Sequence, residues 1–554
     1  MSMSSRSAAV LPVLLLAIIA LSRIVSIWDG RDPGYDQAML MSNFPLPPFA
    51  TYFGPLPYFE QAAPLGSVLE LDLVSRIFGN EGLTRFTVIR LIAAALAVGG
   101  YFILWRIMRR YFETPEVLWA IALLACTNEV LLFTTNPKQY VFGFFFACAL
   151  LWAGLSFLDR PTLKRAAVFT GCAILACLFA FTAPLILATV GGGLLAELIS
   201  RHRNSAMSGP DFQQGLYRLL GLGAVTLTIS LGFHVWYTLP MAELDQIAYA
   251  DRYLDSFISV TAPFSAQTIE SVRGILNVYF LMIEPVYFPQ TLHVSGLIWL
   301  LPTIHVLCAV IALVGLPTYW RKAPVLAGGL VIGTLAFLVF NAFQKLPITS
   351  VRHFLFFTPF AVPCFAVGSI VILRWVLNLL RLSRVATPVI CVLSFGLVSV
   401  ALARSADLKN NEISAHLEMV ERHPAKMWVY YGAQPSLRAL RPDLMSGENF
   451  EVVGLLNHNS TTQSWQMQAR DDDNFLTSDD YVERAAKWLS GTDPIWLVFA
   501  HYWPEKLVPG GVSRFVELAR ADGRVCKTST DKGGILVFCA EADAIPQAID
   551  AAFK

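Results

Sequence analysis

The chain has 554 residues, of which 55% are hydrophobic and only 15% are charged, and its mean hydropathy is +0.55. Soluble globular proteins carry about 25% charged residues, so this composition lies well outside their range. It also excludes a disordered tail and a coiled coil, both of which are rich in charged residues. The net charge of +1 leaves no basic surface large enough to bind a nucleic acid backbone. The sequence therefore predicts an integral membrane protein.

Several stretches of mostly apolar residues are long enough to cross a bilayer as helices, which takes about 20 residues. We count eleven of them, at 8–27, 88–106, 115–134, 139–158, 166–182, 184–200, 216–237, 293–316, 323–342, 353–373 and 386–403. Phe181-Thr182-Ala183-Pro184 reads as a tight turn between two short spans. A single long bent helix at this place is the alternative, and it would invert the topology of everything that follows.

Basic residues are distributed unequally between the connections of these spans. With the N-terminus inside, the inner segments hold 15 Arg and Lys residues, whereas the short outer connections hold only Lys138, Lys345 and Arg352. This bias is the positive-inside pattern of multi-pass membrane proteins. Eleven spans then place the C-terminus outside, together with three long outer segments at about 28–87, 239–291 and 405–554.

The last outer segment differs in kind from the rest of the chain. Short β-like runs at 427–431 and 495–499 alternate there with helical patterns at 413–422 and 512–521. A segment of about 150 residues can bury a core of its own. We therefore predict an all-α polytopic transmembrane domain at 1–404 and a soluble α/β domain at 405–554.

Nine cysteines are present, and seven of them lie in the predicted spans, where they are expected to act as small apolar residues. Cys526 and Cys539 lie in the last segment and flank a turn signal at 528–534. Antiparallel strands joined by this turn would bring the two sulfurs within bonding range in an oxidising compartment. The two open interpretations are a disulfide and a pair of buried thiols.

Carboxylates gather where the chain leaves the first span. Asp29, Asp32 and Asp36 fall within eight positions, and Glu60 follows. The stretches 35–43 and 64–78 read as amphipathic helices suited to the membrane interface. Ionisable groups near membrane depth are candidates for function, and the alternative is that these acids only solvate an outer loop.

Cations occur at two other places on the predicted outer face. Lys138 directly precedes Gln139-Tyr140 at the start of the fourth span, and Arg352-His353 lies at the start of the tenth. A lysine can hold a phosphate as a point charge, and an arginine can bind phosphate oxygens bidentately. The alternative for both places is simple anchoring to ordinary lipid headgroups.

Motifs of several other enzyme classes are absent from the sequence. The chain has no phosphate-binding Gly-Lys-Ser/Thr loop, no His-Glu-x-x-His, no Cys-x-x-Cys and no Gly-x-Ser-x-Gly. These absences argue against a nucleotide-driven pump and a zinc peptidase. The two halves of the chain also do not look like repeats, which favours an enzyme over an alternating-access carrier.

The order of motifs resembles the bacterial membrane glycosyltransferases of the GT-C superfamily. This group includes protein O-mannosyltransferases and the aminoarabinose transferases of lipid A. The resemblance begins with Tyr35-Asp36-Gln37-Ala38 after the first span. It continues with Ala-Pro-Leu-Gly-Ser-Val-Leu-Glu-Leu at 63–71, Arg-Ile-Phe-Gly at 76–79 and Thr-Arg-Phe-Thr-Val-Ile-Arg-Leu at 84–91.

Later motifs extend the resemblance over nearly the whole chain. Lys138-Gln139-Tyr140 is similar to a motif of uncharacterised bacterial members, and Val351-Arg352-His353-Phe354 with Thr358-Pro359 is similar to their late span. The runs at 429–435 and 496–501 are similar to segments in the C-terminal tails of these family members. The resemblance implies a GT-C type fold, with the transmembrane domain as the catalytic one.

The resemblance also implies a reaction and a role for several residues. Such enzymes move a sugar from a polyprenyl-phosphate donor to an acceptor at the outer face of the membrane, with inversion at the anomeric carbon. The first-loop aspartate of the family is the general base, and Asp36 matches it. Lys138 and Arg352, together with Tyr140 and His353, would then bind the donor and stabilise its departing phosphate.

One position departs from the family pattern. The glutamate that follows the family's aspartate is Gln37 here, so Asp29 or Glu60 would have to supply a second carboxylate, or the Gln37 amide orients the acceptor. No metal-binding residues are assigned and no cofactor is required by the sequence, although a divalent metal stays open.

The expected partners are the polyprenyl-phosphate sugar donor, a glycan, lipid or protein acceptor and the bilayer, but no nucleic acid. The expected location is the bacterial inner membrane, with a cytoplasmic N-terminus and a periplasmic C-terminal domain. Two other functions stay open: a non-catalytic transporter or flippase of lipid-linked sugars, and a scaffold for envelope assembly.

Overall fold

The structure is a computed structural model. It describes residues 5–28, 32–47, 52–54, 56, 62–79, 82–136, 138–238, 240, 257–258, 265, 268, 301–343, 351–405, 413–445, 452–453, 479–500, 511–531 and 534–553. The chain forms two compact units. The transmembrane unit comprises Met1–Ser26, Ala63–Ser67 and Arg90–Asp407, and the sheet unit comprises Ile27–Ala62, Val68–Ile89 and Leu408–Lys554.

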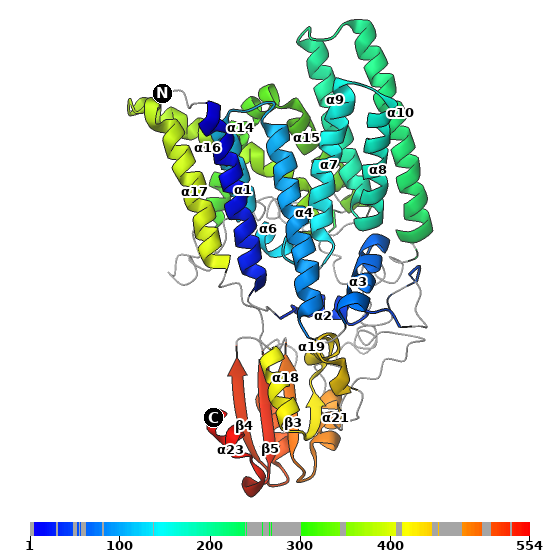
Figure 1. Ribbon diagram of the computed structural model, residues 1–554, viewed down its shortest axis with the longest axis vertical. Helices are drawn as coiled ribbons and strands as arrows, with labels where there is room; N and C mark the ends of the chain where they lie inside the picture. The colour runs from blue at the N-terminus through cyan, green and yellow to red at the C-terminus, as the bar shows by residue number, and fades with distance from the viewer. Residues whose placement is uncertain are drawn as a thin grey trace. The chain divides into compact units, whose positions relative to one another are not determined.

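Long helices make up the transmembrane unit (Figure 1). They are α1 (Ser5–Trp28), α4 (Thr84–Met108), α5 (Thr114–Cys126), α6 (Asn128–Phe133), α7 (Tyr140–Asp159), α8 (Leu163–Phe179), α9 (Ala183–Arg203), α10 (Gly209–Phe233) with η1 (His234–Thr238), α14 (Leu301–Lys322), α15 (Pro324–Ala342), η4 (Val351–Phe357), α16 (Thr358–Leu379), η5 (Ser383–Val385) and α17 (Ala386–Ser405). The first residues of α4 and the last of α1 belong to the sheet unit.

A helix coincides with each of the eleven predicted spans. Among the described residues, eight helices are long and apolar enough to cross a membrane. The other three predicted spans correspond to α5 with α6, to α8 and to α14. The predicted turn is confirmed, because α8 ends at Phe179 and α9 begins at Ala183. The predicted span 115–134 is not one helix, since extended backbone at Thr127 separates α5 from α6.

Small residues let the transmembrane helices pack closely. On α9 and α15, a Cβ atom added to Gly193 would meet the backbone carbonyl of Val325, and one added to Gly328 would meet Ala196. On α14 and α16, a Cβ atom added to Gly368 would meet the backbone of Ile311. Such contacts are typical of helix pairs in membranes, where close backbone approach replaces the hydrophobic effect as the source of packing energy.

A five-stranded sheet forms the centre of the sheet unit, with the strand order β2-β1-β3-β5-β4 (Figure 1). The strands are β1 (Lys426–Val429), β2 (Val452–Val453), β3 (Ile495–Ala500), β4 (Val525–Asp531) and β5 (Gly534–Ala540). The helices of the unit are α2 (Tyr35–Met41), α3 (Leu65–Phe78), α18 (Ile413–Arg422), α19 (Gln434–Leu440), α21 (Asp479–Leu489), α22 (Gly511–Arg520) and α23 (Gln547–Ala552), with short turns η6 (Tyr431–Ala433), η7 (Pro442–Met445) and η8 (Ala542–Ala544).

The sheet is mixed and is covered on both faces. Strand β1 pairs in parallel with β2 and β3, whereas β5 runs antiparallel between β3 and β4. On one face Trp428 packs against Phe515 of α22, with 4.9 Å between the ring centroids. On the other face Trp496 packs against Phe538 and Phe553. All six residues of β3 are buried, as expected for a central strand. The predicted α/β character of this segment is confirmed.

Candidate functional site

A stack of three side chains occupies the start of α7 and the turn η4 in the transmembrane unit. The rings of Tyr140 and His353 lie 5.8 Å apart and are inclined by 21°. The Arg352 guanidinium lies 5.8 Å from the centroid of the Tyr140 ring. Its Nε donates a hydrogen bond of 3.1 Å to Nε2 of His353. The structure thus brings together three of the residues that the sequence singled out.

The hydrogen bond between Arg352 and His353 determines what the imidazole can do. Because an arginine side chain is only a donor, Nε2 of His353 must be the acceptor, and the proton of a neutral ring then lies on Nδ1. Nε2 is therefore occupied in orienting Arg352.

Lys138 lies two residues before Tyr140. Its backbone N–H donates a hydrogen bond of 2.9 Å to Oδ1 of Asn136, which is an Asx-type turn between α6 and α7. Tyr140 packs edge-on against Phe133 of α6, with 5.4 Å between the centroids. The turn and the ring contact fix the backbone that carries Lys138 next to the stack, and the Lys138 side chain is half-buried.

Asp36 and Gln37 belong to the sheet unit and lie in the first turn of α2. The carbonyl of Gly34 accepts from the backbone N–H groups of Gln37 and Ala38, which begins the helix. Asp36 is partly exposed, whereas Gln37 is buried. A carboxylate in the first helical turn is stabilised by the positive end of the helix dipole.

The sequence also singled out Asp29, Asp32 and Glu60 in this region, and the structure describes only one of them. Asp29 and Glu60 lie outside the described residues. Asp32 is buried, and its Oδ2 accepts a 2.9 Å hydrogen bond from the backbone N–H of Ser414, in the first turn of α18. Asp32 therefore stabilises the beginning of a helix, as an N-capping side chain does. In the described ranges, no three His, Cys, Asp or Glu side chains gather as they would around a metal ion.

Helix α3 carries two acids in contrasting surroundings. Asp72 accepts hydrogen bonds from the Leu46 backbone N–H, Tyr52 and Arg76, at 2.7, 2.6 and 2.8 Å. Burial alone would raise the pKa of Asp72, but these hydrogen bonds outweigh it and lower the pKa. For Glu70 no partner is found within the described part of the chain, and burial raises its pKa to about 7.

Buried arginines were missed at the sequence level. Arg23 on α1 is fully buried and donates to the Tyr101 hydroxyl at 3.0 Å and to the Ala125 carbonyl at 2.7 Å. The signal was available, because Arg23 is the one arginine inside the apolar run 8–27. Arg85 is also buried, and it donates to the carbonyl oxygens of Phe44 and Ala439 within the sheet unit.

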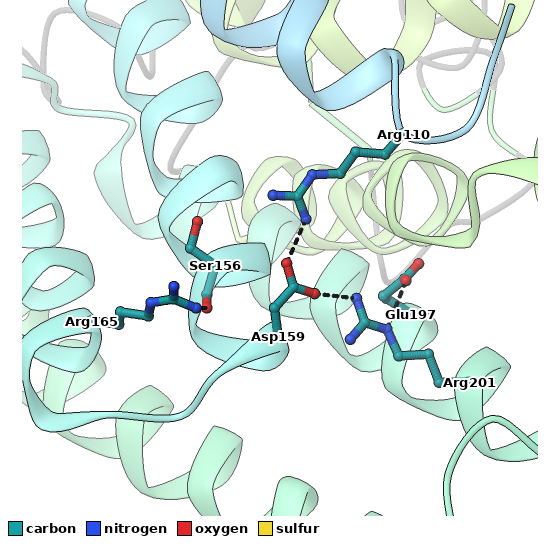
Figure 2. A network of polar contacts seen from close by, with 6 residues as sticks. All are labelled: Arg110, Ser156, Asp159, Arg165, Glu197 and Arg201. Atoms are coloured by element: carbon teal, nitrogen blue, oxygen red, sulfur yellow. Dashed lines mark hydrogen bonds and ion pairs between the residues drawn. The ribbon is translucent and has the colours of Figure 1, made fainter.

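A network of charged side chains joins helix ends in the transmembrane unit, as Figure 2 shows. Asp159 at the end of α7 pairs with Arg110 at 2.8 Å and with Arg201 at 2.9 Å, and Arg201 also pairs with Glu197 at 2.9 Å. Burial and the nearby charge of Glu197 raise the pKa of Tyr111, which lies between α4 and α5. Asp159, Arg110 and Arg201 lie in segments predicted to be inner, and their ion pairs connect the ends of neighbouring helices.

Cys526 and Cys539 face each other on paired strands β4 and β5 and form a disulfide. Within the described ranges the remaining cysteines are free thiols, all at least half-buried. Of the two interpretations left open by the sequence, the structure has the disulfide.

Comparison with known proteins identifies a family domain and a fold. Residues 63–206 match the family described as dolichyl-phosphate-mannose-protein mannosyltransferase. This segment covers about a quarter of the chain and contains Lys138 and Tyr140. No curated protein matches the chain closely enough to count as a relative.

Two crystal structures of ArnT from Cupriavidus metallidurans are similar over nearly the whole chain. The apo structure has 14% sequence identity and a TM-score of 0.53, and the match covers 98% of this chain and 100% of that chain. The structure bound to undecaprenyl phosphate has 13% identity and a TM-score of 0.52, with 97% and 99% covered. The resemblance to GT-C glycosyltransferases is thus confirmed in one family domain and in the fold, and the chain is a multi-pass membrane protein.

Proposed function

We propose that this protein is a membrane glycosyltransferase that moves a sugar from a polyprenyl-phosphate donor to an acceptor hydroxyl. The match of residues 63–206 to a mannosyltransferase family carries the proposal, because that segment includes Lys138 and Tyr140. The fold shared with a protein that binds undecaprenyl phosphate supports a lipid-phosphate donor.

Arg352 and Lys138 are the proposed ligands of the donor phosphate. The Arg352 guanidinium is planar and suited to bind two phosphate oxygens bidentately, and His353 orients it. Lys138 adds a second positive charge from the neighbouring turn. Both cations stabilise the negative charge that develops on the phosphate as the sugar departs, which is the usual source of catalysis in such sites.

Asp36 is the proposed general base. The acceptor hydroxyl gives its proton to the Asp36 carboxylate while its oxygen forms a bond to the anomeric carbon. The bond between that carbon and the phosphate oxygen breaks, and its electron pair leaves with the polyprenyl phosphate. Attack opposite the leaving phosphate inverts the anomeric centre. The buried Gln37 amide is suited to orient the acceptor.

We also propose the orientation of the chain. The predicted inner segments hold 15 basic residues and the short outer connections hold three. This difference favours a cytoplasmic N-terminus. The reaction then takes place at the periplasmic face of a bacterial inner membrane, on the side of residues 405–554. The disulfide between Cys526 and Cys539 supports an oxidising compartment for that segment.

The donor site is tested by mass spectrometry of the protein purified in mild detergent. The wild type should carry polyprenyl phosphate or a polyprenyl-phospho-sugar, and Lys138→Ala and Arg352→Ala should lose it. Lys164→Ala and Arg203→Ala are matched controls, because both side chains are exposed and lie in predicted inner segments. Ordinary phospholipid alone, unchanged by any of the four substitutions, would contradict the donor site.

Asp36→Asn separates an enzyme from a flippase that binds the same lipid. Under the proposed mechanism the variant should lose transfer by at least about 10²-fold while keeping the co-purifying lipid, since general base catalysis contributes about 10²–10⁴-fold. Transfer is measured in proteoliposomes with a synthetic polyprenyl-phospho-sugar. Transfer at the wild-type rate would remove Asp36 from the mechanism.

A further inference from the structure

A cavity of about 470 Å³ lies within the sheet unit, and a volume of this size can hold a small molecule. One of its walls is a face of α18. The remaining walls are formed by Gly82 and Leu83, in the turn before α4, and by Leu440 and Arg441 at the end of α19. We call it the α18 cavity.

The face of α18 that lines the cavity is polar. It carries Ser414, Glu418, Glu421 and Arg422, whose spacings of three and four residues place them on one side of the helix. Buried apolar residues occupy the other side, namely Ile413, Leu417 and Val420. The side chains of Glu418 and Arg422 are 65% and 70% exposed and lie 3.6 Å apart. Both can therefore form hydrogen bonds with a ligand in the cavity.

The walls of the cavity are held in place by contacts among themselves. The backbone N–H of Gly82 donates a hydrogen bond of 2.8 Å to the carbonyl of Leu440, which ties the turn to α19. Arg441, whose side chain is 18% exposed, pairs with Glu421 at 2.9 Å and donates to Asp443 at 2.9 Å. A Cβ atom added to Gly82 would meet nothing within 4 Å, so the turn borders open space. A site that is already formed loses little conformational entropy on binding.

The charges of the cavity favour a neutral ligand over an anion. Two arginines and two glutamates line it, so their charges cancel, and Asp443 beside Arg441 adds a negative charge. Arg441 is already matched by two carboxylates, which weakens it as a phosphate ligand. What the cavity offers is carboxylate acceptors, guanidinium donors and the apolar surfaces of Leu83 and Leu440. A sugar ring matches this set, because its hydroxyl groups donate and accept hydrogen bonds and its C–H groups are apolar.

A peptide matches the cavity less well than a sugar. Peptides usually bind by adding a strand to a free sheet edge or by filling an apolar groove. The turn of the cavity has its backbone groups bonded already, since the N–H of Gly82 is paired with the carbonyl of Leu440. Half of the lining residues are charged, so the cavity is not an apolar groove.

The α18 cavity lies near Asp36 in the same unit. The backbone N–H of Ser414, a lining residue, donates a hydrogen bond of 2.9 Å to Asp32. Asp32 and Asp36 are four residues apart, so their Cα atoms are separated by at most about 14 Å. We infer that the α18 cavity is a subsite for a neutral sugar residue of the acceptor, which is held there while another hydroxyl of the acceptor reaches Asp36. The inference rests on the proposed function and narrows the acceptor to a saccharide.

The test measures the binding of four neutral trisaccharides, built of glucose, mannose, galactose or N-acetylglucosamine, to the full-length protein in nanodiscs. Saturation-transfer difference NMR gives the Kd of each. The cavity variant is Glu418→Ala with Arg422→Ala. The matched control is Glu517→Ala with Arg520→Ala, which removes an exposed glutamate and an exposed arginine of α22 that do not line the cavity. All four side chains are exposed, so both variants should fold, and thermal unfolding checks this.

At least one trisaccharide should bind the wild type, and the cavity variant should bind it about tenfold more weakly, because hydrogen bonds to two charged groups are lost. The control should bind it as the wild type does. Binding of none of the four trisaccharides, or equal binding by the two variants, would overturn the inference. Tighter binding of trigalacturonate, an acidic trisaccharide, that is lost in the cavity variant would also overturn it.

The binding assay involves no donor and no transfer, so Asp36→Asn should bind the trisaccharide as the wild type does. Saccharide binding at the cavity without any transferase activity would contradict the proposed function. Transferase activity without binding at the cavity would contradict only the subsite. The two failures are therefore distinguishable.

Discussion

Replacing Glu116 by glutamine should lower the stability of the transmembrane unit by about 2 kcal/mol. Oε1 of this residue accepts from Lys322 Nζ at 3.1 Å and from Arg374 Nη1 at 3.0 Å. The three residues lie on α5, α14 and α16, so a single carboxylate oxygen joins three helices. Its other oxygen accepts from the backbone N–H of Glu113 and completes a capping box at the start of α5.

The magnitude follows from the exposure of the partners. The Glu116 side chain is 4% exposed, whereas those of Lys322 and Arg374 are 37% and 39% exposed. Exposed ion pairs contribute about 0.2–1 kcal/mol, and breaking a buried pair costs about 3–5 kcal/mol. A buried acid with two half-exposed cations lies between these limits, at about 1 kcal/mol for each contact. The glutamine variant also leaves two cations around one neutral oxygen, which adds repulsion between them.

The measurement is thermal unfolding in detergent at a fixed scan rate, because large membrane proteins seldom unfold reversibly. For a chain of this size about 2 kcal/mol corresponds to a few degrees in apparent Tm. Glu113→Gln is the control, since Glu113 is 75% exposed, lies 3.6 Å from Arg374 and keeps a capping oxygen as glutamine. An equal change in both variants, or none in either, would show that the buried carboxylate does not join these helices.

Three further substitutions test other parts of the structure. His353→Phe should raise the KM for the donor several-fold with little change in kcat, because it removes the hydrogen-bond acceptor that orients Arg352. His353→Gln should restore part of the lost affinity. An unchanged KM in both variants would contradict this role of His353. Glu70→Gln should raise the apparent Tm at pH 8 but not at pH 4, because burial raises the pKa of Glu70 from 4.5 to about 7. The wild type therefore loses stability as the pH rises between these values, and a Tm difference that is the same at both pH values would refute the assignment. Gly368→Ala should destabilise the α14–α16 pair by at least about 1–3 kcal/mol, since the new Cβ would collide with the backbone of Ile311. Gly171→Ala is the control and should be neutral, because Gly171 has open space around it. Equal thermal stability of the two variants would contradict the packing.

Local sequence patterns predicted most of the transmembrane helices and the strands β1 and β3, but not the break between α5 and α6. A run of about 20 apolar residues can cross the lipid only as a helix, so hydropathy alone predicts the spans. In the last segment, the runs at 427–431 and 495–499 gave β1 and β3, and the patterns at 413–422 and 512–521 gave α18 and α22. These elements are set by residues that are neighbours in the sequence.

Contacts between distant segments could not be predicted in this way. Asp32 bonds to Ser414, Ser42 bonds to the carbonyl of Pro435, and Arg85 bonds to the carbonyl of Ala439. The partners are separated by 382, 393 and 354 residues. An aspartate or arginine in an outer loop reads only as a surface charge, because nothing in the sequence shows that a helix end or a carbonyl will lie beside it.

The sequence suggested the residues of the proposed donor site, but it could not predict how their side chains contact one another. Lys138, Arg352 and His353 were proposed because cations near membrane depth suit a phosphate, and Tyr140 because it belongs to the motif Lys138-Gln139-Tyr140. The sequence could not show that the Tyr140 and His353 rings stack or that His353 accepts a hydrogen bond from Arg352. Whether a side chain binds the phosphate or orients its neighbour depends on which of its nitrogen atoms is hydrogen-bonded and to which atom.

The break in the span 115–134 and the buried Arg23 explain each other. Extended backbone at Thr127 ends α5, so the carbonyls of its last turn lose partners within the helix. Inside a bilayer such groups must be satisfied by the protein, and Arg23 donates to the Ala125 carbonyl at 2.7 Å. The end of a helix carries partial negative charge, which suits a cation, and the Tyr101 hydroxyl supplies a further acceptor at 3.0 Å. A continuous helix would leave the Arg23 guanidinium without this carbonyl, and an apolar residue at position 23 would leave the carbonyl without its donor.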